Sequence, residues 1–156
     1  MVDFTRGIWD QHKLFLGMTL QQLDDENRHH RLTADSSSAG FWLQHVSESK
    51  LALMQLFWGI EPPVPIPTCN GAHDTGQAGT ADEIRALNDR INKIVEAHMD
   101  TFSAEAMGET HDTFLGQMTV SQMFGVMIYH TYYHMGQASL ALKKGKQPSA
   151  LAMASA

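Results

Sequence analysis

The sequence lacks the features that would place this chain outside the cell or in a membrane. Its single cysteine, Cys69, cannot form an internal disulfide, which favours a reducing compartment. No apolar run approaches the roughly 18 to 20 residues that a membrane span needs. The first residues, MVDFTRGIWDQ, contain no apolar signal core. We therefore expect a cytoplasmic protein with no membrane partner.

Clustered positive charge is also scarce. The net charge is -6, and the one basic cluster is the short run KKGK at 143–146. Because phosphate binding depends on clustered Lys and Arg, the composition argues against a nucleic-acid partner. The plain interpretation of KKGK is a set of cations at a helix C-terminus, where the helix dipole favours them.

A chain of 156 residues suits one domain with one core. We place this domain at 1–148 and expect 149–156 to be a flexible C-terminal tail. Helical apolar spacing marks four segments, with capping residues before the last three: about 4–26, from the serines at 36–38 to 59, 81–102, and 119–144 with Gly145 at the C' position. The stretch between the third and fourth segments is expected to be irregular. The pattern predicts an all-α protein, a four-helix bundle.

The segment 60–79, IEPPVPIPTCNGAHDTGQAG, is a long connection between the second and third helices. It holds four of the five prolines and shows no sustained period. Twenty extended residues can span about 66 Å, whereas a helix of 24 residues is about 36 Å long. The linker can therefore return along the bundle and begin the third helix parallel to the second. Cys69 in this linker is interpreted as an incidental loop cysteine, with a redox site as the alternative.

Two of the nine histidines stand four residues apart in YHTYYHMGQ, the stretch 129–137. His130 and His134 occupy successive interior positions of the fourth helix, so both imidazoles can reach one point beside it. At 1.5 Å of rise per residue, His45 lies within roughly 4 Å of their level, His98 lies about 10 Å away, and His12 is a second-tier candidate. Imidazole nitrogens suit zinc and similar metals. The alternative is a set of buried histidines, each with its own hydrogen-bond partner.

Three better-known metal sites fit the sequence poorly. A zincin protease has H-E-x-x-H, but Thr131 stands where the glutamate is needed. A di-iron bundle needs Glu-x-x-His on two helices, and here only Glu26 to His29 fits. A haem held by two histidines would leave the pair in the fourth helix redundant.

With His45 in WLQHVSESK and the pair in YHTYYHMGQ, the chain resembles the DinB/YfiT-like superfamily of metal-dependent enzymes. The family pattern has one histidine in the second helix, followed by small and acidic residues, and H-x-x-x-H-x-G-Q in the fourth. The resemblance implies a down-up-up-down bundle, a three-histidine site for a divalent metal, zinc or nickel most often, and homodimers. Some relatives use a low-molecular-weight thiol as cosubstrate. Many members have Arg where this chain has Met135, so an anion-binding role of that arginine is not carried over.

Three protein ligands leave at least one coordination position open, as in catalytic metal sites. We expect a water or a substrate thiol there, with its pKa lowered by the metal. Glu48, one turn after His45, is predicted as the catalytic base; holding a ligand imidazole, or lying on an exposed helix face, are the alternatives. Gln137 is predicted to bind substrate, with packing at the rim as the alternative.

The sequence thus predicts a metal-dependent hydrolase or a thiol transferase that acts on a small molecule. One alternative is a non-enzymatic bundle that binds a metal or another ligand. Another is a dimeric interaction protein, which rests on the methionine-rich faces alone.

Overall fold

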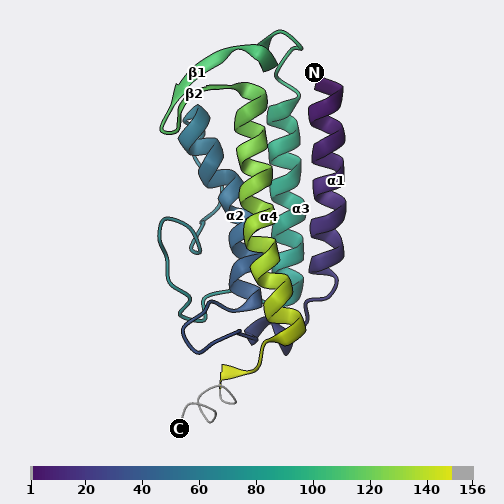
Figure 1. The fold of residues 1–156 in the computed structure, drawn as a ribbon, viewed down its shortest axis with the longest axis vertical. Coiled ribbons are helices and arrows are strands. Elements are labelled where there is room, and N and C mark those ends of the chain that lie inside the picture. Colours follow the sequence, from purple (N-terminus) through teal and green to yellow (C-terminus); the bar gives the residue numbers. More distant parts are fainter. Residues whose placement is uncertain (1, 149–156) are drawn as a thin grey trace.

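The computed structural model describes residues 2–148, which form four long helices with a small hairpin at one end (Figure 1). The helices are α1 (Val2–Leu20), α2 (Ala39–Trp58), α3 (Ala81–Met99) and α4 (Val120–Lys144). Short 3-10 turns lie at Asn27–His29 and Ala106–Gly108. The chain is mostly helical, as predicted, while the predicted tail at 149–156 lies outside the described residues. No helix of the described part is long and apolar enough to cross a membrane.

Side-chain caps set the residues at which three of the helices begin. The Ser38 hydroxyl accepts a hydrogen bond from a backbone N–H in the first turn of α2. Thr80 with Glu83, and Thr119 with Gln122, form reciprocal capping boxes before α3 and α4. These three starts agree with the sequence prediction.

The end of α1 differs from the prediction. The apolar pattern predicts a helix to residue 26, but α1 ends at Leu20. The Asp24 carboxylate accepts hydrogen bonds from the backbone N–H groups of Glu26 and Asn27, at 2.9 Å and 2.6 Å. A side chain that binds nearby backbone in this way competes with the helix, so the chain turns here.

Gly145 follows the last residue of α4, as predicted, but it does not have the left-handed conformation that is common for a glycine at this place, because its φ is -70° and its ψ is 165°. Glycine is needed for another reason. A Cβ at this position would lie 2.3 Å from the Ala141 carbonyl oxygen. The close approach lets Lys146 pair with Arg31 in an isolated bridge, which fixes the end of α4 to the loop after α1.

The sequence predicts an irregular stretch before α4. The structure instead has an antiparallel hairpin there. Strand β1 (Thr110–Thr113) pairs with β2 (Gly116–Thr119). Gly116 begins the second strand with a φ of 96°, a left-handed value that glycine adopts without steric cost. The all-α protein therefore carries one small sheet at the end of the bundle.

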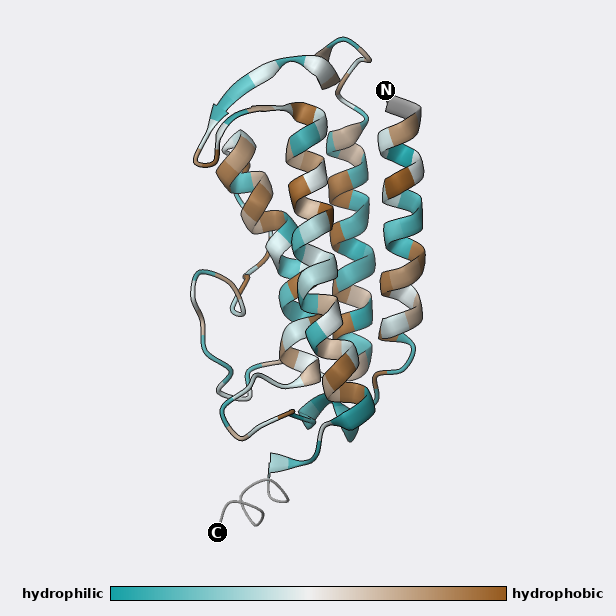
Figure 2. Ribbon diagram, in the orientation of Figure 1, coloured by the Kyte–Doolittle hydropathy of each residue, from teal (hydrophilic) through white to brown (hydrophobic). Residues whose placement is uncertain are grey.

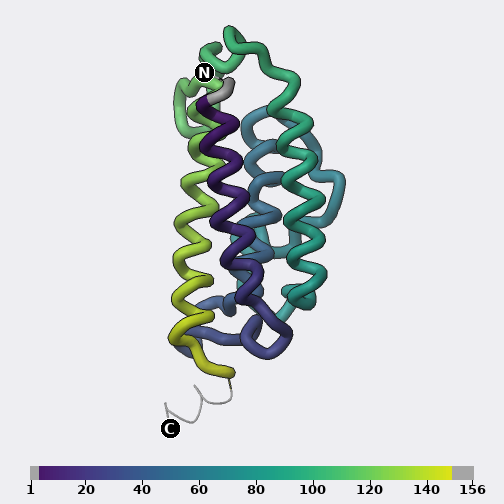
Figure 3. The backbone as a smooth tube through the Cα atoms, turned by 90° about the vertical axis from the view of Figure 1, so that its right-hand side faces the viewer, coloured from purple at the N-terminus to yellow at the C-terminus, as the bar shows by residue number. Residues whose placement is uncertain are grey.

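Residues 59–80 run along the side of the bundle. Gly59 ends α2 with a φ of 66°, and the linker then returns beside α2 (Figure 1). The helices α2 and α3 consequently start at the same end of the molecule, while α1 and α4 start at the opposite end. Seen from the side, α1 lies in front between α4 and α3, and α2 lies behind (Figure 3).

The core consists of two apolar clusters with a polar layer between them. Trp9, Met54 and Phe124 belong to one cluster, and Leu16 and Leu43 to the other. Half-way along α1, a hydrophilic stretch separates hydrophobic ones (Figure 2). The buried polar side chains at this level, from all four helices, are His12, Ser47, Glu48, Lys50, Asn88, Asn92 and Thr131. Because buried polar groups need partners, this layer is where a specific site can form.

Candidate metal centre

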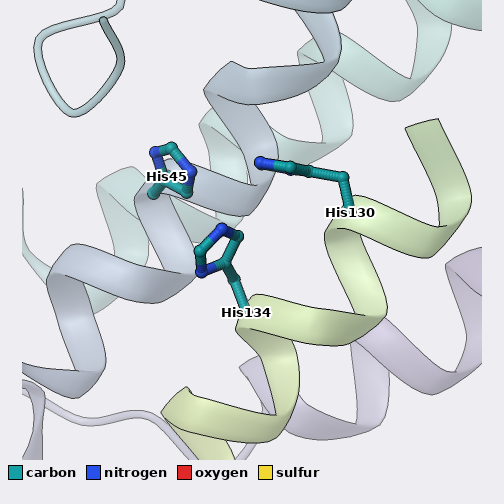
Figure 4. A group of neighbouring side chains, drawn as sticks. All are labelled: His45, His130 and His134. Carbon is teal, nitrogen blue, oxygen red and sulfur yellow. The ribbon is translucent and has the colours of Figure 1, made fainter. Parts of the chain in front are cut away.

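Three histidines from two helices meet at one edge of the polar layer. His45 of α2 and His130 and His134 of α4 each offer a ring nitrogen, and these three atoms all lie within 4.8 Å of one another. The ring centroids are 4.6 to 5.3 Å apart. Figure 4 shows the rings directed at the gap between the two helices. The structure thus brings together the three histidines that the sequence singles out.

Hydrogen bonds fix the orientation of two of the rings. Nδ1 of His45 lies 2.7 Å from the Thr68 carbonyl oxygen. Nδ1 of His134 lies 2.6 Å from Oε1 of Gln137. Since both oxygens are acceptors, each Nδ1 carries the proton, and the lone pair of each imidazole is on Nε2. Metal-binding histidines are oriented by oxygen acceptors of this kind.

The surroundings keep all three imidazoles neutral. Burial lowers the pKa of His45 and of His134. Burial, followed by the neighbouring His134 and His45, lowers the pKa of His130 to about 4. Neutral imidazole is the form that binds a metal. Nδ1 of His130 is buried and has no hydrogen-bond partner among the described residues.

The donor set fits a divalent ion such as zinc. Three nitrogens, each about 2.1 Å from a tetrahedral ion, would be about 3.4 Å apart, so the three rings need to close only slightly. The donors are all imidazole nitrogens, which zinc, nickel and copper accept more readily than magnesium or calcium do. The residues present therefore fit the metal that the sequence predicts.

Glu48 is fully buried, so the alternative of an exposed helix-face glutamate is wrong. Its Oε1 accepts a hydrogen bond from Gln44, and its Oε2 accepts two from Thr68, through the backbone N–H at 2.8 Å and the hydroxyl at 2.5 Å. The carboxylate thus holds Thr68, whose carbonyl holds His45. The predicted role of Glu48 as a base stays a prediction, while its contacts favour the alternative role of holding a ligand imidazole.

Gln137 orients a histidine ring as well, on the α4 side of the centre. The sequence predicts substrate binding for this residue, and the structure places its amide oxygen against His134. The amide is partly buried, one turn along α4 from the ring that it orients. Its contact supports a positioning role; the substrate-binding role stays a prediction.

Cys69 is buried rather than loosely held in the linker. Its side chain is 5% exposed, and Sγ lies 3.9 Å from Nδ1 of His45. Burial, together with the nearby Glu48, raises the pKa of the thiol to about 12. A thiol that stays protonated is a poor nucleophile, which argues against a reactive role for Cys69.

The remaining candidates lie outside the centre. His12 is fully buried against Trp9 and Tyr132, and both of its ring nitrogens lack a hydrogen-bond partner among the residues that the structure describes. His98 packs against Trp58, with ring centroids 4.7 Å apart, in the aromatic cluster at the hairpin end. Within the described residues, neither belongs to the three-histidine group.

A pocket of about 320 Å³ opens beside the centre. Its walls include His45, His134, the aromatic residues Phe41 and Trp42 of α2, and Thr68 with residues 71–73 of the linker. Small molecules bind in concave, mostly apolar sites with a few polar groups, and this pocket has that character. A substrate can therefore reach His45 and His134 from the linker side.

Two residues of this site, Thr68 and Trp42, are not among those predicted from the sequence. Thr68 lies in a proline-rich linker without periodicity, and nothing local signals that its backbone contacts two helical side chains. Trp42 stands three residues before His45 and thus on the same helix face, a spacing from which its contact with the site could have been inferred. Its ring stacks on His134 at 4.5 Å.

Comparison with known proteins agrees with the geometry. No curated protein matches the chain. The family model of the DinB superfamily matches residues 14–138, which include α2, α3 and all three histidines. That match covers most of the chain, and the chain belongs to the DinB superfamily.

Proposed function

We propose that this protein is a metal-dependent enzyme, a hydrolase or a low-molecular-weight-thiol transferase, that acts on a small molecule. The divalent ion, zinc or nickel, is held by His45, His130 and His134. One observation carries the proposal: three neutral imidazoles offer nitrogens within 4.8 Å of one another, beside a pocket. Two of these rings have their Nδ1–H groups engaged by oxygen acceptors, which leaves Nε2 as the ligand atom.

When bound, such an ion supplies a Lewis acid that lowers the pKa of a water or thiol. The chain's own residues provide the rest. Thr68 and Gln137 orient two of the ligand rings, and Glu48 orients Thr68. Phe41 and Trp42 form an apolar wall that excludes water from one side of the pocket. Substrate binding by Gln137 and proton transfer by Glu48 belong to the same proposal.

The proposal includes the down-up-up-down order of the helices and a cytoplasmic location. The course of the linker beside α2 supports the first. The single cysteine, buried and unpaired, supports the second, because a reducing compartment leaves such a thiol free.

Elemental analysis of protein purified without a histidine tag tests the centre. We expect close to one zinc or nickel per chain in the wild type and little in His134→Ala. His111→Ala, which removes an exposed histidine of β1, serves as the matched control and should keep its metal. Equal metal in the wild type and in His134→Ala would show that the proposed ligands are wrong.

Turnover separates an enzyme from a binding module. Fully metal-loaded protein is assayed with ester and amide substrates for hydrolysis, and with bacillithiol, mycothiol and glutathione for thiol conjugation. Turnover in either set that His134→Ala lacks supports the proposal. An occupied centre without turnover in both sets favours the alternative, a non-enzymatic metal-binding bundle.

A further inference from the structure

The pocket beside the metal centre has no charged residue in its walls. Within the described residues, its lining contains neither Asp or Glu nor Lys or Arg. The nearest acidic residue of the linker is Asp74, whose carboxylate is engaged elsewhere: it pairs with Arg31 at 2.8 Å and accepts a hydrogen bond from the Ser38 N–H at 2.7 Å. A charged group on the part of a ligand that lies along these walls, away from the metal, would therefore lose its hydration without gaining a counter-ion from the protein.

The wall formed by α2 is aromatic, and each of its rings lies nearly parallel to the ring of a histidine beside it. The rings of Trp42 and His134 are nearly parallel, with an interplanar angle of 15° and a centroid distance of 4.5 Å. The rings of Phe41 and His45 are also parallel, at 2° and 6.2 Å. A flat ligand can extend such an arrangement, because aromatic rings prefer offset-stacked or edge-to-face contacts at these distances.

The opposite wall is a segment of the linker that is fixed at both ends. Glu48 holds Thr68, and Arg31 with Ser38 holds Asp74, as described above. Between these anchors, Asn70 and Gly71 have φ values of 56° and 75°, so the backbone turns sharply. The segment is thus a defined wall of the pocket and not a loose loop.

From these features we infer that the centre takes a flat organic molecule, aromatic or conjugated, whose metal-binding end faces His45 and His134 and whose uncharged body lies between Trp42 and residues 71–73. This inference rests on the proposed function and names its substrate class. It favours hydrolysis of a substrate with a neutral body over transfer from a carboxylate-bearing thiol, because carboxylates that lie along these walls, away from the metal, would have no partner.

Three hydroxamic acids test the inference, because they bind divalent metals through the same two oxygens and differ only in the rest of the molecule. Acetohydroxamic acid has no ring, benzohydroxamic acid has a neutral ring, and 4-carboxybenzohydroxamic acid has a charged one. Affinities are measured by calorimetry on fully zinc-loaded protein. We expect benzohydroxamic acid to bind at least about tenfold more tightly than each of the other two, as one well-packed ring or one unpaired charge would produce.

Two variants show whether the pocket is the cause. Trp42→Leu should reduce the preference for benzohydroxamic over acetohydroxamic acid, with the affinity for acetohydroxamic acid as the internal reference. Ala72→Lys places a cation on the linker wall and should raise the affinity for the carboxylated ligand at least about tenfold, since the added charge gives its carboxylate a partner.

The outcomes separate this inference from the proposed function. Zinc-loaded protein that binds all three ligands equally, or that prefers the carboxylated one, overturns the inference and leaves the metal centre standing. Protein that retains no zinc overturns both. A ring preference that Trp42→Leu leaves unchanged places the ligand outside this pocket and also overturns the inference.

Discussion

Glu48 is the residue on which the orientation of His45 depends. It touches the centre only through Thr68, whose N–H and hydroxyl it binds and whose carbonyl oxygen receives the His45 Nδ1–H. We expect Glu48→Gln to weaken zinc binding by about 10- to 100-fold, because residues that orient ligand histidines have effects of this size. Competition with a fluorescent chelator measures the affinity.

Glu61→Gln is the control for this experiment. Glu61 is an exposed glutamate whose side chain accepts a hydrogen bond from Gln55 and not from any residue of the three-histidine site. The Glu61→Gln protein should bind zinc with the affinity of the wild type. An unchanged zinc affinity in a folded Glu48→Gln protein would contradict the positioning role and return Glu48 to the role of a base.

Gln137 can orient His134 or bind substrate, and two substitutions distinguish these roles. Gln137→Leu removes the acceptor 2.6 Å from Nδ1 of His134 and should weaken zinc binding by at least about tenfold. Gln137→Glu keeps an acceptor and should bind zinc at least as well as the wild type. If neither change alters the zinc affinity while both raise KM, then Gln137 binds substrate and does not position the ring.

At the scale of helices and loops, the sequence predicts what is local and misses what depends on distant contacts. The capping residues Thr80 and Thr119 act within one turn, so both helix starts are predicted correctly. Gly145 is a glycine because of a close approach to Ala141 and Arg31, which no local pattern shows. The histidine triad is predictable because helical rise places three seam positions at one level. Thr68 is not, because its contacts depend on the course of a linker without periodicity.

The polar layer contains a buried lysine, Lys50, with which no carboxylate of the described residues forms an ion pair. The ammonium of Lys50 donates to the amide oxygens of Asn88 and Asn92, at 3.0 Å and 2.7 Å, and lies 5.5 Å from the centre of the Trp9 ring. Burial lowers the pKa of Lys50 to about 7, although the more distant Asp89 and Glu96 of α3 oppose the shift. The neighbouring His12 is likewise buried; its pKa is lowered to about 3 by burial and then by Lys50.

This arrangement predicts a stability that rises with pH. Between about pH 7 and pH 10.5 the unfolded chain keeps the Lys50 proton that the folded protein releases, so the free energy of unfolding increases with pH by up to about 1.4 kcal/mol per unit. Lys50→Met should remove this slope, as urea denaturation at pH 7.5, 8.25 and 9 would show. Lys93→Met, at an exposed position of α3, is the control for losing a positive charge. Parallel slopes in Lys50→Met and the wild type would contradict the prediction.

At the scale of the whole molecule, the face formed by α1 and α4 carries several large, exposed apolar side chains. Phe4, Ile8, Phe15 and Met18 of α1 are 36 to 71% exposed, and Tyr129 of the neighbouring α4 is 71% exposed. The two helices lie side by side (Figure 3), with an apolar groove of about 240 Å³ between their first halves. Extended apolar patches on soluble proteins are commonly interaction sites.

The spacing of this stripe favours a second copy of the chain as the partner. Residues 4, 8, 11, 15 and 18 follow steps of four and three, the spacing of a seam that packs against another helix, and no described helix of the chain covers it. A two-fold axis would bring the same stripe of two chains together, as in most soluble homodimers. The predicted homodimer thus has a definite candidate interface in α1 and α4, and the metal centre, between α2 and α4, stays accessible from the linker side.

Substitution within the stripe tests this interface. We expect the wild type to sediment as a dimer at high concentration and Phe15→Glu to sediment as a monomer, because a charge in the middle of a buried apolar seam has no partner there. Leu56→Glu, at a 59% exposed position of α2 outside the stripe, is the matched control and should stay dimeric. Phe15 does not line the pocket beside the three histidines, so Phe15→Glu should keep its helical content and its metal. Retention of both would show that the variant has dissociated without unfolding. A wild type that remains monomeric at high concentration, or a Phe15→Glu protein that remains dimeric, would place the partner of this face elsewhere.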